Sequence, residues 1–128
     1  MTNSGLSYTR GTLQAKDVDV VGSLLNNILQ VTGPTTLDGT HLYIMLTGTG
    51  PYTITLPQIS QVGAIILTFW VRDQSTPTIT VQTQRTDLIG VTPGSPAIDN
   101  FVLDQYYATA IIMSDPTVNR WYVLSYIG

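Results

Sequence analysis

The sequence predicts an all-β fold, and three observations support this prediction. Residues that favour strands outweigh those that favour helices: threonine is abundant, and all eight acidic residues are aspartates. Apolar and polar side chains alternate in short runs, as from Tyr52 to Leu56. Such runs recur about every ten residues with turn residues between them, which favours a sandwich or a barrel over alternating strands and helices. We therefore expect an antiparallel β-sandwich or a jelly-roll-like barrel with an extended N-terminal arm.

The arm is expected to span residues 1–39. Its first residues are small and polar, and turn-forming residues between Pro34 and Gly39 separate it from the rest of the chain. Residues 17–21 alternate as a short strand would. Residues 23–31 fit either a helical stripe or a strand that follows a turn, and we favour the strand.

The body is expected to span residues 40–128 and to start with a hairpin. Asp38–Gly39 is a dipeptide that suits a tight hairpin turn, and residues 41–46 alternate after it. Proline and glycine then divide the remaining chain into short apolar runs. Further strands are expected at residues 52–56, 64–72, 78–83, 98–103, 106–113 and 120–127.

The strand predicted at residues 64–72 is apolar on both faces. Leu67 and Phe69 share one face, whereas Ile66 and Trp70 lie on the other. A strand of this kind is typical of a central position or of a sheet that a partner covers. The core is predicted to contain Ile54, Leu56, Ile65, Leu67, Phe69, Ile79, Val81, Ile112 and Val123.

The composition argues against several classes of function. Charged residues make up 10% of the chain against a usual share of about 25%, and the net charge is −3. The five cations are scattered, so we expect neither nucleic acid nor a membrane surface as a partner. No apolar run is long enough to span a bilayer, and the absence of cysteine excludes disulfides and thiolate chemistry.

With so few charged side chains, much of the surface is expected to be apolar. We therefore expect other subunits to cover part of this apolar surface. The residues that we expect at such an oligomer interface are Ile66, Trp70, Tyr106, Ala108 and Ala110.

Catalytic and metal-binding interpretations are weaker than structural ones, and we expect no enzyme activity, no metal and no cofactor. His41 is the only histidine, which rules out a multi-histidine metal site within one chain, and a strand-edge role is expected. Asp17 and Asp19 suggest calcium ligands but fit a solvated strand face better. Asp99 and Asp104 suggest a glycosidase pair but fit turn capping better.

Aromatic side chains offer one further alternative, the stacking of sugars. The candidates for glycan contact are Trp121, Tyr122 and Tyr126. Aromatic residues in β-rich modules more often pack in the core or at an interface.

The order of strands and turns resembles the small β-sandwich modules at the tips of phage tail fibres, head fibres and capsid spikes. One half of the resemblance is Tyr52-Thr53-Ile54-Thr55-Leu56-Pro57, an apolar strand after Gly63, and Thr78-Ile79-Thr80-Val81. The other half is Gln105-Tyr106-Tyr107-Ala108, Ile111-Ile112-Met113-Ser114-Asp115 and Asn119-Arg120-Trp121-Tyr122-Val123.

This resemblance implies a homotrimeric structural protein on the surface of a virion that is assembled in the host cytoplasm. The short chain fits a capsid cement or decoration protein, or a short spike or fibre knob. Its partners would be its own copies and the major capsid protein or other virion proteins, with the arm providing attachment. The alternative function is a receptor-binding fibre tip that recognises a glycan on the host cell surface.

Overall fold

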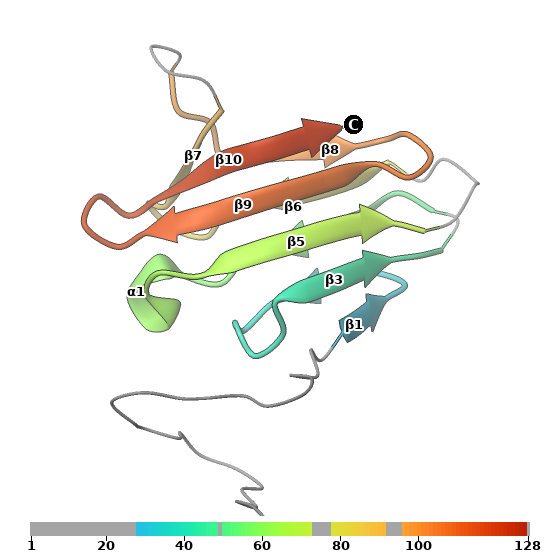
Figure 1. The fold of residues 1–128 in the computed structure, drawn as a ribbon, viewed down its shortest axis with the longest axis horizontal. Helices are drawn as coiled ribbons and strands as arrows, with labels where there is room; N and C mark the ends of the chain where they lie inside the picture. Colours follow the sequence, from blue (N-terminus) through green and yellow to red (C-terminus); the bar gives the residue numbers. More distant parts are fainter. Residues whose placement is uncertain (1–27, 49, 73–77, 92–95, 128) are drawn as a thin grey trace, which may run out of the picture.

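The computed structural model describes residues 28–48, 50–72, 78–91 and 96–127, which form two mixed β-sheets and one short helix (Figure 1). The fold is therefore all-β, as the composition and the alternating pattern predict. The six-stranded sheet has the order β1 (Ile28–Val31), β3 (Tyr43–Leu46), β5 (Ile66–Val71), β9 (Thr109–Asp115), β10 (Arg120–Ile127) and β7 (Leu88–Gly90). The four-stranded sheet has the order β2 (Thr35–Thr36), β4 (Tyr52–Thr55), β6 (Ile79–Gln82) and β8 (Asn100–Leu103). The helix α1 (Ile59–Val62) lies between β4 and β5.

The chain alternates between the two sheets from β1 to β8. Odd-numbered strands enter the six-stranded sheet and even-numbered strands enter the four-stranded sheet. From β1 to β6, strands two apart in sequence are parallel neighbours, so that β1, β3 and β5 stack in one sheet and β2, β4 and β6 in the other. This is the winding of a two-sheet β-solenoid, which the antiparallel strands β8 and β9 then interrupt.

The predicted antiparallel pairing is therefore wrong for much of the fold. Alternation of side chains fixes which face of a strand is buried, but it does not fix the direction of the neighbouring strand. The Asp38–Gly39 turn shows the consequence. It is a real turn, in which Thr40 donates to the Asp38 carboxylate and Gly39 has a φ of 84°, but it joins strands of different sheets and closes no hairpin.

The buried side chains of both sheets form one hydrophobic cluster. Of the predicted core residues, all are buried in this cluster except Ile65 and Val123, which are partly buried and pack against it. The largest fully buried side chain in the described part of the chain is Trp121 on β10. The facing of β4, β5 and β6 was thus predictable from alternation alone.

The predicted boundary at residue 39 lies too far along the chain. Val31 and Leu37 are buried in the core, with 3% and 4% of their surface exposed. The strand β1 pairs with β3 and β2 pairs with β4, and the Leu37 amide donates to the Thr55 carbonyl at 2.9 Å. Residues 28–39 therefore belong to the body. Within residues 23–31, the strand that we favoured is present at residues 28–31, whereas the strand predicted at 17–21 lies outside the described residues.

Two buried polar side chains fix the segment that leads into β5. The Asp87 carboxylate accepts a hydrogen bond from the Ile59 amide at 2.9 Å, which satisfies a backbone donor at the start of α1. The Ser114 hydroxyl donates to the Gly63 carbonyl at 2.6 Å and accepts from the Ile65 amide at 2.8 Å. The Ser114 contacts hold residues 63–65 against β9, and the Asp87 contact ties the start of α1 to the approach to β7.

Asp38 and Asp115 are expected to titrate at unusually low pH. Hydrogen bonds from Thr40 hold the pKa of Asp38 below its ordinary value, and those from Thr117 do the same for Asp115. Since the folded pKa is the lower one, the stabilisation is present above the unfolded pKa of about 4 and is lost as pH falls through the folded value. We expect carboxyl NMR titration to show both midpoints below those of model peptides.

The matched variant for this titration is Thr117→Val, which removes one donor and keeps the side-chain shape. It should raise the Asp115 midpoint and leave that of Asp38 unchanged, because the Asp38 carboxylate has its own threonine. Equal midpoints for Asp115 in both proteins would contradict the role of the hydroxyl.

Candidate functional site

The outward side of the six-stranded sheet is uncharged along its centre. In β5, Leu67, Phe69 and Val71 point into the core, so Ile66, Thr68 and Trp70 point outward. Ile66 and Trp70 are 48% and 39% exposed. We define the outer face as the outward side chains of β3 and β5 together with those of β9 from Thr109 to Met113: Tyr43, Met45, Ile66, Thr68, Trp70, Thr109, Ile111 and Met113. None of them carries a charge, whereas the next outward side chain of β9, Asp115, is an acid.

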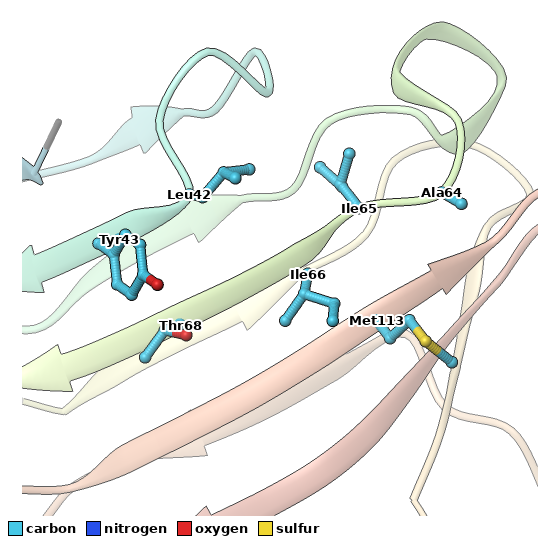
Figure 2. A pocket seen from close by; sticks show the side chains of 7 residues that line it. All are labelled: Leu42, Tyr43, Ala64, Ile65, Ile66, Thr68 and Met113. Atoms are coloured by element: carbon cyan, nitrogen blue, oxygen red, sulfur yellow. The ribbon is translucent and has the colours of Figure 1, made fainter. Parts of the chain in front are cut away.

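A hollow of about 570 Å³ lies in the outer face at the start of β5 (Figure 2). The small side chain of Ala64 leaves this space open beside the larger groups that border it. A second hollow of about 170 Å³ lies beside it, next to Tyr43 and Trp70. The larger hollow is lined by Leu42, Tyr43, Ala64, Ile65, Ile66, Thr68 and Met113, which come from β3 and its approach, from β5 and its approach, and from β9.

An exposed aromatic pair lies at the opposite end of β5. The rings of Trp70 and Tyr107 are stacked, with centroids 6.4 Å apart and an angle of 15° between their planes. Tyr107 has a φ of 58°, in the left-handed region that bulky residues rarely adopt. The Thr109 hydroxyl donates to the Tyr107 carbonyl at 3.2 Å and supports this turn. We call the pair of Trp70 and Tyr107 the aromatic knob.

No protein-family model, curated protein or solved structure matches this chain. A function is therefore inferred from the chemistry of these surfaces.

The residues predicted for the oligomer interface divide into two groups. Ile66 and Trp70 lie on the outer face, and Tyr106 is 55% exposed in the turn before β9. Ala108 and Ala110 are fully buried, because they point to the same side as Ile112 and pack in the core. Their side chains have no surface to offer to a partner, and this part of the expectation is corrected.

The three aromatic residues predicted for glycan contact do not form a common platform. Trp121 is fully buried and faces the core, so it is not available to a sugar. Tyr122 pairs with Met113 and lies on the outward side, where its ring is next to Gly90. Tyr126 packs edge-on against Phe101, and its hydroxyl donates to the Val102 carbonyl. Burial, with a contribution from the Asp104 charge, raises the pKa of Tyr126.

The described residues do not bring the candidate catalytic groups together. Nδ1 of His41 lies 3.0 Å from the Thr40 hydroxyl in the exposed turn before β3. Asp99 and Asp104 flank the extended strand β8, so their backbones are about 16 Å apart and their side chains start from opposite ends of the strand. Asp17 and Asp19 lie outside the described residues.

Within the described residues, no three histidine, cysteine or acidic side chains gather as metal ligands would. No helix there has both the length and the apolar character needed to cross a membrane.

Sequence reasoning identified Ile66 and Trp70 but missed the rest of the site. Leu42, Ala64 and Met113 belong to three separate segments, and only the pairing of β5 with β3 and with β9 brings them to one hollow. The sequence shows Tyr107 as one of several tyrosines. No sequence pattern predicts its left-handed backbone or its stack on Trp70.

Proposed function

We propose that this protein is a structural protein of a virion surface, a homotrimeric β-sandwich that serves as a capsid cement or decoration protein or as a short spike or fibre knob. The observation that supports self-association is the uncharged outer face with its hollow. Contiguous apolar patches on soluble proteins mark interaction sites. The virion surface and the three-fold symmetry rest on the order of strands and turns that resembles fibre-tip and spike modules.

A structural role fits the site better than catalysis does. The outer face presents aliphatic, aromatic and threonine side chains, and the hollow has no cluster of titratable groups that would act as an acid, a base or a nucleophile. An uncharged surface is best covered by another uncharged surface. Because only 10% of the residues of this chain are charged, a second copy of the chain provides such a surface.

Light scattering at micromolar concentration should give three times the mass of one chain at both low and high salt. Apolar burial drives the association, and ion pairs contribute little, so that salt has a weak effect. A monomer at both salt concentrations would contradict the assembly, whereas a dimer would keep the apolar interface and contradict the three-fold symmetry.

The place of the protein on a particle is tested by binding to capsid particles and by screening on a glycan array. Binding to capsids alone supports a decoration protein. Specific binding to a glycan would instead support the receptor-binding tip, whose site would then have to lie away from the buried Trp121.

A further inference from the structure

We infer that the aromatic knob of one copy inserts into the hollow of the next copy. This inference rests on the proposed self-association and specifies its contact. The hollow lies at the Ile66 end of β5 and the knob at the Trp70 end, four residues further on, which corresponds to about 13 Å along the strand. Both belong to one rigid face, so a chain cannot fill its own hollow with its own knob.

The two surfaces match in chemistry. The hollow is bordered by Leu42, Ala64, Ile66 and Met113, and its polar groups are few. Ligand sites for polar small molecules need several convergent polar groups to orient the ligand, and this hollow does not supply them. Aromatic rings bring a large apolar area with a polar edge, which is the kind of group that anchors protein interfaces.

Two contacts restrain the knob before it binds. The stack on Trp70 and the Thr109 hydrogen bond both restrict Tyr107, whose left-handed backbone is unfavourable for a tyrosine. Strained conformations of this kind persist where the surrounding structure holds them, often at functional sites. A preorganised group loses little entropy on binding, which favours association.

The size and the symmetry of the contact also agree. At about 570 Å³ the hollow falls in the range of about 300–1,000 Å³ found for pockets that take drug-sized ligands, which are at least as large as an aromatic side chain. The knob and the hollow are different patches, so one copy can contact the next heterologously, and such contacts form a ring such as a trimer where the rotation between copies closes.

The test uses two variants that disable opposite halves of the contact. Ala64→Trp fills the hollow and keeps the knob, whereas Trp70→Ala removes the knob and keeps the hollow. Both sites are exposed, so the core is untouched. Native mass spectrometry and light scattering should show association weakened at least tenfold for each variant alone. A mixture of the two should form mixed pairs, because one variant supplies a knob and the other an open hollow.

The matched controls are Ala64→Ser, which leaves the hollow open, and Val118→Ala at an exposed site in the β9–β10 turn. Both should associate as the parent chain does, and thermal melting checks that every variant folds. A parent chain that is monomeric overturns the proposed assembly and this contact with it. If the parent chain associates and the two variants associate equally well, the knob-and-hollow contact alone is overturned. The same holds if the parent chain associates but the mixture of variants forms no mixed pairs.

Discussion

A chain that begins at His41 is expected to lose most of its stability. The deletion removes β1 and β2, and with them the buried side chains of Val31 and Leu37. Each such side chain contributes about 1.5–3 kcal/mol when it is buried. Their loss, about 3–6 kcal/mol, compares with a total of about 5–15 kcal/mol for a typical domain. The loss of pairing along β3 and β4 adds to this cost.

The matched control for this deletion is a chain that begins at Ile28, which keeps every described strand. Urea unfolding of the two shortened chains separates the contribution of residues 28–40 from that of the preceding ones. Equal unfolding midpoints would show that β1 and β2 are dispensable and that the body begins near residue 40, as the sequence pattern alone suggests.

The strands and their buried faces could be predicted because alternation is a local signal. Ile54, Phe69 and Val81 each stand in a run whose period of two places them in the core. The order of the strands depends on contacts between distant segments, which composition and period do not encode. The Asp38–Gly39 turn is an example, since the same dipeptide serves a hairpin or a crossing between sheets.

The part of the site that lies on β5 could be predicted from the sequence of that strand. Ile66 and Trp70 make β5 apolar on its second face, and that pattern indicates a covered sheet. In β9 and the residue before it the same reasoning failed, because small residues such as Ala108 and Ala110 fit an interface as well as a crowded core. Only the packing of Ala110 opposite Phe69 in the neighbouring strand decides between the two.

Phe69→Ala is expected to lower the free energy of unfolding by about 3–5 kcal/mol, since Phe69 is fully buried and its removal leaves a cavity. Chemical denaturation measures this loss, and it should be followed at several protein concentrations because association stabilises the folded chain. Thr68→Ala is the matched control in the same strand. Its side chain points outward, and the change should cost about 1 kcal/mol or less.

The same pair of variants tests the outer face. Successive side chains of β5 point to opposite sides, so the burial of Phe69 is what turns Ile66 and Trp70 outward. A loss below about 1 kcal/mol for Phe69→Ala would place that residue on the surface and reverse the strand. In that case Ile66 and Trp70 would lie in the core, and neither the hollow nor the aromatic knob would be available to a neighbouring copy.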